Sequence, residues 1–125
     1  MKQVLVVDDE ADCREFVTAV LDKVGSCRVL PAANGNEAQA QVRAQRPDLI
    51  ILDVNMPEKD GYDTFCELRR TPTTADIPVI MLSSLSEMGG YLGDNPAPLR
   101  PQLFVEKPID PDILAGMVKR TLSPE

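Results

Sequence analysis

The chain has 125 residues, and we expect residues 1–125 to form one domain that buries about two thirds of its unfolded surface without a disulfide or structural metal. Its 20 acidic and 13 basic residues give a net charge of −7, which argues against a nucleic acid or an anionic membrane as a direct partner. Histidine is absent, which excludes Ser-His-Asp triads, Cys-His pairs and imidazole-ligated zinc sites.

Predicted strands and helices alternate from the start of the chain. Residues 2–7, KQVLVV, are mostly β-branched and apolar and predict a first strand. Residues 27–32 predict a second strand, and Pro31 places it at an edge of the sheet because proline cannot donate to a ladder. Between them, helical spacing predicts a helix at 11–24 whose inner face is formed by Cys13, Phe16, Val17, Val20 and Val24.

The next helix and strand lead to a buried acid. Asn34 and Glu37 form a variant capping box that opens a helix running to about Arg46. In residues 49–57, LIILDVNMP, four apolar residues run into Asp53 and the strand breaks two residues later. A carboxylate in this position lies at the rim of the sheet, where open α/β folds place their chemistry.

The second half of the chain continues the alternation. Residues 61–71 predict a helix, with Phe65 and Leu68 on its inner side, and residues 78–84 predict a fourth strand. Residues 85–102 are rich in glycine and proline and predict at most one short helix near 86–92.

A short fifth strand and a last helix complete the predicted fold. The strand covers 103–105, and Asp110 caps a helix that begins at Pro111. Five strands alternating with helices predict an α/β fold with a parallel sheet covered by helices on both faces. The inner face of the last helix is predicted to contain Ile113, Leu114, Met117, Val118 and Leu122.

Polar residues follow four of the five predicted strands at one edge of the sheet. They are Asp8, Asp9, Asp53, Ser83 and Lys107. If the first and third strands are neighbours about 4.8 Å apart, the three carboxylates converge. Two like charges ~4 Å apart repel by about 4 kcal/mol at an effective dielectric constant near 20, so the cluster needs a cation.

Oxygen ligands without histidine or a nearby thiolate suit Mg²⁺, with Mn²⁺ as a substitute. Lys107 would add a positive charge opposite the metal, and Ser83 a hydroxyl donor. A phosphoryl group would then be held on three sides, which is what its transfer to Asp53 as an acyl phosphate requires. Each residue alone is compatible with an ordinary structural role, and their joint placement favours the site.

These segments resemble the receiver domain of two-component response regulators. The resemblance rests on VLVVDDE, LIILDVNMP, the strand end at Ser83 and FVEKP, and it covers essentially the whole chain. It implies a flavodoxin-like, doubly wound, five-stranded parallel sheet in the order 2-1-3-4-5, here with an irregular or shortened fourth helix. The usual output surface of the family includes that fourth helix, and residues 88–101 depart from its regular pattern.

The resemblance also assigns roles to individual residues. Asp53 would accept phosphate from a phosphohistidine of a histidine kinase or a histidine phosphotransfer protein. Asp9 and Asp53 would bind Mg²⁺ directly, Asp8 mainly through water, and Asn55 through its backbone carbonyl. The chain would promote its own phosphorylation and slow dephosphorylation.

The same resemblance implies a switch. Lys107 would contact the phosphoryl group, Ser83 would rotate toward it, and Phe104 would move with Ser83 as the switch aromatic. Ser83 stands in place of the commoner threonine, and Phe104 lacks the hydroxyl of the commoner tyrosine. Neither difference removes the predicted chemistry.

Localisation and assembly follow from weaker signals. No run approaches the ~18–20 apolar residues of a membrane span, and the first residues do not resemble a signal peptide, so we expect a cytoplasmic protein. Cys13, Cys27 and Cys66 are predicted to be buried free thiols without chemistry. We expect a monomer or a weak phosphorylation-dependent dimer with an unidentified downstream partner, either as a stand-alone receiver or as part of a longer regulator or hybrid kinase.

Two other functions fit the sequence. The first is a protein-interaction module with the receiver fold whose output is independent of phosphorylation, suggested by residues 88–101. The second is a small magnesium-dependent hydrolase with an aspartyl-phosphate intermediate. The hydrolase is disfavoured because the chain has no cap domain and Asn55 stands where a second acid is needed, two residues after Asp53.

Overall fold

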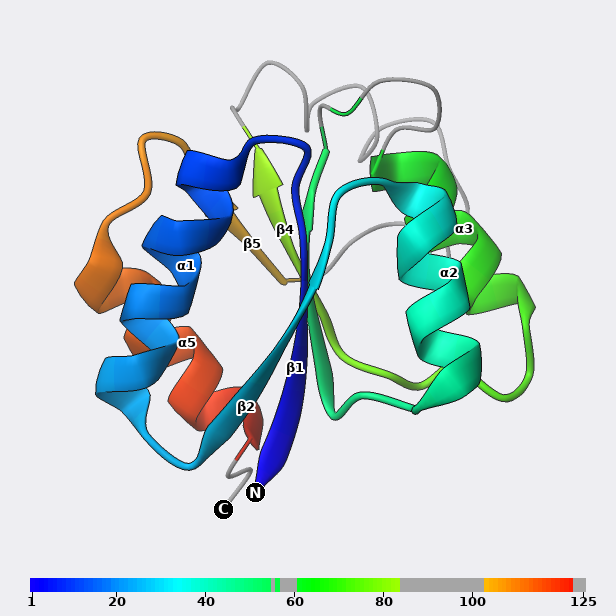
Figure 1. Cartoon of the computed structure of the whole chain (residues 1–125), viewed down its shortest axis with the longest axis horizontal. Helices are drawn as coiled ribbons and strands as arrows, with labels where there is room; N and C mark the ends of the chain where they lie inside the picture. The colour runs from blue at the N-terminus through cyan, green and yellow to red at the C-terminus, as the bar shows by residue number, and fades with distance from the viewer. Residues whose placement is uncertain (55, 57–60, 84–102, 123–125) are drawn as a thin grey trace.

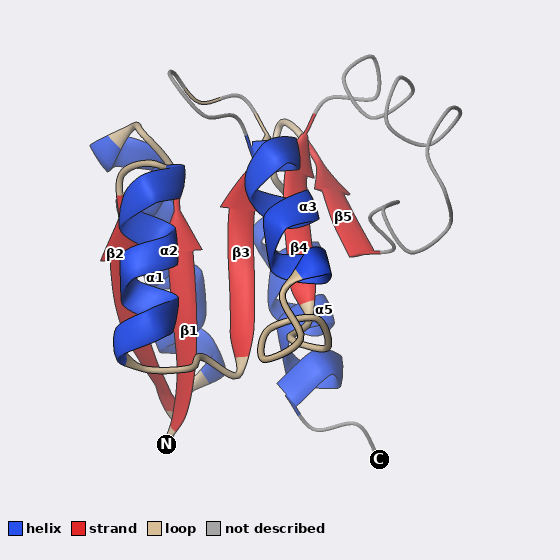
Figure 2. Ribbon diagram, turned by 90° about the vertical axis from the view of Figure 1, so that its right-hand side faces the viewer, coloured by secondary structure: helices blue, strands red, loops and turns tan. Residues whose placement is uncertain are grey.

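Five parallel strands form one sheet with helices on both faces (Figures 1 and 2). The computed structural model describes residues 1–54, 56, 61–83 and 103–122. The strand order β2-β1-β3-β4-β5 confirms the predicted flavodoxin-like topology and the edge position of the strand that contains Pro31. The strands are β1 Lys2–Val7, β2 Cys27–Ala32, β3 Leu49–Asp53, β4 Val79–Ser83 and β5 Leu103–Glu106.

The helices of the described residues pack in pairs. Helices α1 and α5 cover one face of the sheet, and α2 and α3 cover the other (Figure 1). None of the helices in this part of the chain is both long and apolar enough to cross a membrane. The bounds are α1 Ala11–Val24, α2 Gly35–Ala44, α3 Gly61–Arg70 and α5 Pro111–Leu122.

The central strands are buried on both sides, which explains their continuous apolar runs. Every residue of β3 and β4 is buried, and side chains alternate between the two core layers. Ile50 and Leu52 face α2 and α3, whereas Leu49 and Ile51 face α1 and α5. The alternation follows from the two-residue period of a strand.

Two residues expected on inner helix faces are exposed. The side chain of Phe16 is 40% exposed and that of Ile113 is 56% exposed, so their placement in the core was wrong. Each stands one position, or about 100° of helical rotation, before a fully buried residue, Val17 or Leu114. This offset carries both side chains to the edge of the buried stripe of their helix. In α1, Leu21 lies on the buried face instead of Phe16.

The predicted helix caps are present, and some predicted ends shift. Asn34 Oδ1 accepts a hydrogen bond of 2.8 Å from the Glu37 N–H, and Asp110 Oδ1 accepts one of 2.8 Å from the Asp112 N–H. Helix α2 ends at Ala44, before the predicted Arg46, because the next residue is extended. The expected short or irregular fourth helix lies outside the described residues.

Gly61 lets the first turn of α3 approach the end of β3. Its N–H donates to the Val54 carbonyl oxygen at 2.8 Å. A Cβ atom at this position would lie 2.0 Å from the Asp53 carbonyl oxygen and 2.7 Å from Val54 Cα. Both neighbours are backbone atoms and have no rotamer to change, so only glycine fits without moving the strand end.

We expect Gly61→Ala to lower the free energy of unfolding by about 1–3 kcal/mol or more, because the clash displaces backbone. Gly116→Ala in α5 is the matched control, since its Cβ would meet no atom within 4 Å. The control should raise stability by about 0.5–1 kcal/mol through helix propensity. Denaturant unfolding measures both changes, and equal effects of the two substitutions would contradict the steric explanation.

Candidate functional site

Three carboxylates meet at the carboxyl edge of the sheet. Asp8 and Asp9 follow β1, Asp53 ends β3, and β1 and β3 are hydrogen-bonded neighbours. One ligand oxygen from each of the three acids lies within 4.8 Å of the others. Asp8 and Asp53 are only 1% and 2% exposed, whereas Asp9 lies at the exposed rim. The parallel topology therefore produces the predicted acidic cluster.

Asp8 is the least satisfied member of the cluster. Its Oδ1 accepts a hydrogen bond of 2.9 Å from the Glu10 N–H, but its buried Oδ2 has no hydrogen-bond partner in the described part of the chain. Burial raises the pKa of Asp8, the Glu10 N–H opposes that shift, and the negative charge of Asp53 adds to it. A buried carboxylate in this state is stabilised either by a proton or by a bound cation.

Lys107 supplies the opposite charge. Its Nζ lies 2.6 Å from Asp53 Oδ1, and its side chain is 31% exposed. Asp53 ends β3 and Lys107 directly follows β5, and these strands are separated by β4 and hence by about 10 Å of sheet. A long side chain is needed to cover this distance. The Lys107 N–H donates to the Ser83 carbonyl oxygen at 2.9 Å, which fixes the start of that side chain.

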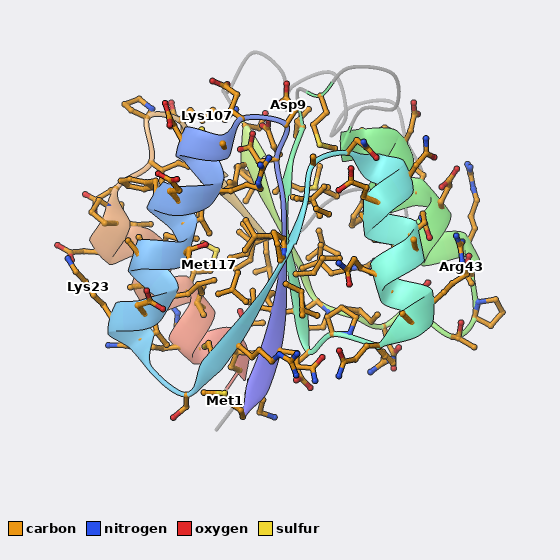
Figure 3. The ribbon with its side chains drawn as sticks, viewed as in Figure 1. Met1, Asp9, Lys23, Arg43, Lys107 and Met117 are labelled. Atoms are coloured by element: carbon orange, nitrogen blue, oxygen red, sulfur yellow. The ribbon has the colours of Figure 1, made fainter. Side chains whose placement is uncertain are left out.

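The two proposed switch residues occupy different environments. Ser83 ends β4, is 1% exposed and pairs in register with Glu106. Phe104 is half-buried and packs against the core layer under α2 and α3. Figure 3 shows Asp9 and Lys107 at the same end of the molecule. Asn55, the predicted backbone ligand, lies outside the described residues.

The donor set of the cluster fits a hard divalent cation. Asp8, Asp9 and Asp53 offer only oxygen atoms at mutual distances below 4.8 Å. The buried Oδ2 of Asp8 has no hydrogen-bond partner among the described residues, so it can offer a lone pair to a cation. An acidic pocket of this kind can hold a metal ion beside the amine of Lys107, and it has the polarity needed to receive a phosphoryl group.

The sequence did not reveal the surroundings of Asp8. The Arg14 Nη1 donates to the Asp8 carbonyl oxygen at 2.6 Å, and the Cys13 thiol lies near the carboxylates of Asp8 and Glu10. One feature of the sequence could have predicted these contacts. Because α1 begins shortly after Asp8 and Asp9, residues of its first turns lie close to them. Of the three cysteines only Cys66 is buried as expected; Cys13 and Cys27 are partly exposed free thiols.

Burial raises the pKa of the Cys13 thiol, and the negative charges of Asp8 and Glu10 raise it further. Such a thiol stays protonated at neutral pH and is a weak nucleophile in the absence of a cation. This electrostatic state separates Cys13 from the low-pKa cysteines used in redox catalysis.

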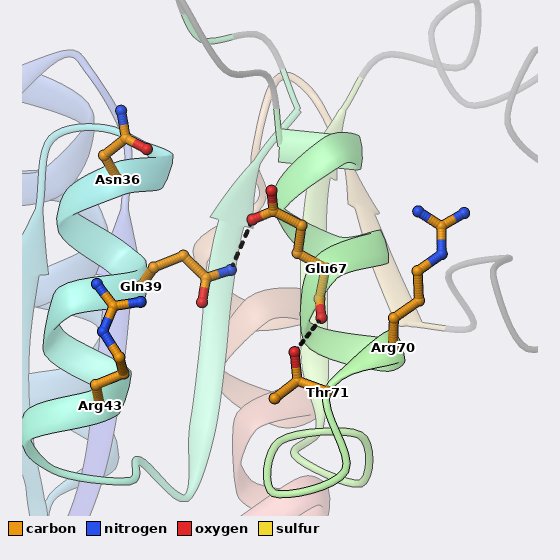
Figure 4. A pocket seen from close by; sticks show the side chains of 6 residues that line it. All are labelled: Asn36, Gln39, Arg43, Glu67, Arg70 and Thr71. Carbon is orange, nitrogen blue, oxygen red and sulfur yellow. Dashed lines mark hydrogen bonds between the residues drawn. The ribbon is translucent and has the colours of Figure 1, made fainter.

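A polar groove between α2 and α3 lies on the face opposite α1 and α5 (Figure 4). Gln39 Nε2 donates to Glu67 Oε2 at 3.1 Å, and Thr71 Oγ1 donates to the Glu67 carbonyl oxygen at 2.8 Å. The described residues that line the groove form no cluster of nucleophiles or metal ligands, and we assign no reaction to it. Its lining is completed by Asn36, Arg43 and Arg70.

Comparison with known proteins gives a consistent result. The family model for the response regulator receiver domain matches residues 4–119. The chain is 36% identical over 121 residues to a probable transcriptional regulator, ycf27, of Cyanophora paradoxa, covering 97% of this chain and 48% of that protein. It is 36% identical over 123 residues to the response regulator Rre1 of Synechocystis, covering 95% and 51%. The chain thus spans about half the length of these relatives.

Solved structures agree with the sequence relatives. The chemotaxis response regulator CheY4 of Vibrio cholerae superposes with a TM-score of 0.84 at 30% identity, covering 98% of this chain and 99% of that one. The signal receiver domain of a histidine kinase from Syntrophus aciditrophicus gives a TM-score of 0.84 at 33% identity, covering 99% and 92%.

The raised pKa of Asp8 has a consequence for stability. In the folded chain the Asp8 carboxyl keeps its proton to a higher pH than in the unfolded chain. The free energy of unfolding therefore falls as the pH rises from the unfolded to the folded pKa of Asp8. At neutral pH without divalent cations we expect Asp8→Asn to raise stability by on the order of 1–2 kcal/mol. The gain should shrink in acid, where Asp8 is neutral. It should also shrink on addition of Mg²⁺, because the ion stabilises the native chain with its Asp8 carboxylate and not the Asp8→Asn variant.

The control for this prediction is Asp12→Asn, which removes the same charge from an exposed position in the first turn of α1. It should leave stability unchanged or lower it by a few tenths of a kcal/mol, because it loses a favourable contact with the helix dipole. Thermal or urea unfolding across pH distinguishes the two variants. A loss of stability in Asp8→Asn at neutral pH would show that the buried charge is already compensated.

Proposed function

Because the chain belongs to the family of response regulator receiver domains, we propose that it is a phosphoacceptor switch in which Asp53 takes a phosphoryl group from a phosphohistidine. The donor would be a histidine kinase or a histidine phosphotransfer protein. The observation that carries the proposal is the position of Asp53, which is 2% exposed, 2.6 Å from Lys107 Nζ and within 4.8 Å of two further carboxylates.

The transfer is a displacement at phosphorus. A carboxylate oxygen of Asp53 attacks the phosphorus, a P–O bond forms, and the N–P bond breaks with its electron pair leaving on the imidazole nitrogen. The ammonium group of Lys107, which pairs with Asp53 Oδ1 in this structure, would move to contact a phosphoryl oxygen as the carboxylate becomes an acyl phosphate. Later attack by water on phosphorus would return the free carboxylate, so the chain would promote its own dephosphorylation.

Mg²⁺, with Mn²⁺ as a substitute, is the cation that we propose for the acidic cluster. Asp8, Asp9 and Asp53 are the protein ligands proposed from the described residues, together with the backbone carbonyl of Asn55. When bound, the ion would neutralise charge on the carboxylates and the incoming phosphoryl group. The unpartnered Oδ2 of Asp8 supports this assignment.

The proposed switch couples Ser83 to Phe104. The Ser83 hydroxyl would turn toward a phosphoryl oxygen, and the half-buried ring of Phe104 would move into the space it leaves. The two residues lie on neighbouring strands, with Phe104 opposite Met81 in register. Because Phe104 has no hydroxyl, packing alone would set its position.

The exposed apolar residues offer a docking face for the phosphodonor. Phe16 lies in the second turn of α1, which begins shortly after the acids of the site, and Ile113 lies in the first turn of α5. The two helices pack against each other on one face of the sheet. Burying such side chains would support a protein contact that holds a phosphohistidine over Asp53.

The wider setting extends the same proposal. We propose one receiver domain over residues 1–125, in the cytoplasm, as a monomer or weak phosphorylation-dependent dimer with an unidentified protein as downstream partner. The relatives named as transcriptional regulators are about twice as long, so their output does not transfer to this chain by itself. The net charge of −7 disfavours direct contact with nucleic acid.

The first test is intact mass spectrometry after incubation with acetyl phosphate and Mg²⁺. We expect one phosphoryl adduct per chain, mapped to Asp53, and none in Asp53→Asn or without Mg²⁺. Asp12→Asn is the control for loss of an acidic group and should be modified like the native chain. An identical adduct in Asp53→Asn would refute the assignment.

The two alternative functions have their own signatures. Partner affinity unchanged by beryllofluoride would favour the phosphate-independent interaction module. Sustained turnover of phosphomonoesters would favour the hydrolase. The segment that suggested the module, residues 88–101, lies outside the described residues.

The docking face is tested by Phe16→Ala and Ile113→Ala. Transfer from a purified phosphohistidine-carrying kinase domain should slow about tenfold, corresponding to about 1.4 kcal/mol of lost contact energy. Phosphorylation by acetyl phosphate should not change, because this small donor needs no docking face. Arg43→Ala, an exposed change on the opposite face, is the control. Equal losses with both donors would place the two residues in the phosphorylation chemistry or in folding rather than in docking.

A further inference from the structure

A partly exposed thiol lies beside the acidic cluster. Cys13 is the third residue of α1, and Glu10 is the residue that caps this helix. One ligand atom from each of Asp8, Glu10 and Cys13 lies within 4.8 Å of the other two. Neither Glu10 nor Cys13 has a part in the phosphoryl chemistry described above.

The second observation is a buried oxygen of Asp8 that makes no hydrogen bond. The Asp8 Oδ1 accepts a hydrogen bond from the Glu10 N–H, whereas Oδ2 is buried and has no hydrogen-bond partner among the described residues. The carboxylate of Asp8 is common to two groups of ligand atoms, one with Asp9 and Asp53 and one with Glu10 and Cys13. An oxygen without a partner at this junction can therefore coordinate a cation on either side.

The chemistry of the two groups differs. Asp9 and Asp53 complete an all-oxygen set that suits Mg²⁺, whereas Cys13 gives the other group a sulfur donor that Mg²⁺ does not use. Two carboxylates and a thiolate are ligands for Zn²⁺ or Co²⁺, with a fourth position left to water. In a chain without histidine, cysteine is the side chain that offers a soft ligand to such ions.

The geometry requires only side-chain movement. Zinc–ligand distances of about 2.0–2.3 Å place the ligand atoms of a tetrahedral site roughly 3.5 Å apart. The present atoms lie within 4.8 Å of one another, so they need to close by at most about 1.3 Å. Glu10 is exposed and Cys13 is partly exposed, so both side chains have room to turn while Asp8 stays fixed.

The local charge also fits a bound divalent ion. Asp8, Glu10 and an ionised Cys13 together carry three negative charges, which exceeds the charge of the ion by one. The Arg14 guanidinium, with Nη1 2.6 Å from the Asp8 carbonyl oxygen, supplies the remaining positive charge. Coordination to the ion would displace the proton of the Cys13 thiol, because metals bind cysteine as the thiolate.

We propose that Asp8, Glu10 and Cys13 form a second cation site, specific for thiophilic divalent ions such as Zn²⁺, that shares Asp8 with the magnesium site. Binding at this site would occupy the Asp8 carboxylate that the magnesium site also needs and so weaken Mg²⁺ binding. Zinc would then inhibit phosphorylation of Asp53. The site itself does not depend on the proposed function, whereas its inhibitory effect does.

The direct test uses Co²⁺ as a coloured probe for zinc. Titration of the native chain should produce a thiolate-to-cobalt charge-transfer band in the near ultraviolet, and Zn²⁺ should abolish it by displacement. Cys13→Ser should eliminate the band, and Glu10→Gln should weaken Co²⁺ binding about tenfold. Cobalt binding without this band, or a band that survives in Cys13→Ser, would overturn the proposal.

Matched controls separate this site from the other cysteines and from the magnesium site. Cys27→Ser and Cys66→Ser should keep the band, because neither thiol belongs to the group around Asp8. Asp53→Asn should also keep it, although this variant loses the proposed phosphoryl acceptor. Urea unfolding of each variant without metal verifies that Cys13→Ser and Glu10→Gln retain the native fold.

A competition experiment tests the shared ligand. Zn²⁺ should lower the affinity of the native chain for Mg²⁺ and slow its labelling by acetyl phosphate, with a smaller effect in Cys13→Ser. A cobalt band in a chain that acetyl phosphate never labels would refute the phosphoacceptor function and leave the zinc site in place. Zinc binding that leaves Mg²⁺ affinity unchanged would refute the sharing of Asp8.

Discussion

The ion pair between Lys107 and Asp53 is the interaction around which this edge of the molecule is arranged. It joins residues 54 positions apart, from two strands that are not neighbours, at a distance of 2.6 Å. Strand β4 lies between β3 and β5, and the carbonyl oxygen of its last residue, Ser83, accepts a hydrogen bond from the Lys107 N–H. Sheet order and this backbone hydrogen bond therefore determine where the Lys107 amine meets the carboxylates.

The charge of Asp53 is balanced by Lys107, whereas the neighbouring Asp8 has no ion pair among the described residues. This difference between the two carboxylates determines what the site can bind. Asp53 has the lysine, whereas Asp8 has one hydrogen bond from Glu10 and a buried oxygen without a partner. A cation that relieves Asp8 would also reduce the repulsion among the acids, so metal binding and readiness for phosphoryl transfer are linked by electrostatics. The thiol of Cys13 would add a choice of metal to this arrangement, because Asp8 belongs both to the group with Asp9 and Asp53 and to the group with Glu10 and Cys13.

Local patterns predicted the elements of the fold well where periodicity and burial agree. The strand runs and the capping residues Asn34 and Asp110 have short-range causes. The errors arose at positions where a helix meets its neighbours. Phe16 and Ile113 are apolar and lie next to buried residues, yet they are exposed because the width of each buried stripe depends on how α1 and α5 pack together.

The sequence alone determined the alternation of strands and helices, the polar residue at each strand end and the absence of imidazole chemistry, because these depend on residue identity and spacing. Family resemblance added the strand order, the phosphohistidine donor and the switch pair of Ser83 and Phe104 as expectations. Only the tertiary structure decided that Asp8 keeps a buried oxygen without a partner and that Cys13 and Glu10 close around it. Such contacts depend on how the first turn of α1 folds back over the end of β1, which residue spacing along the chain does not specify.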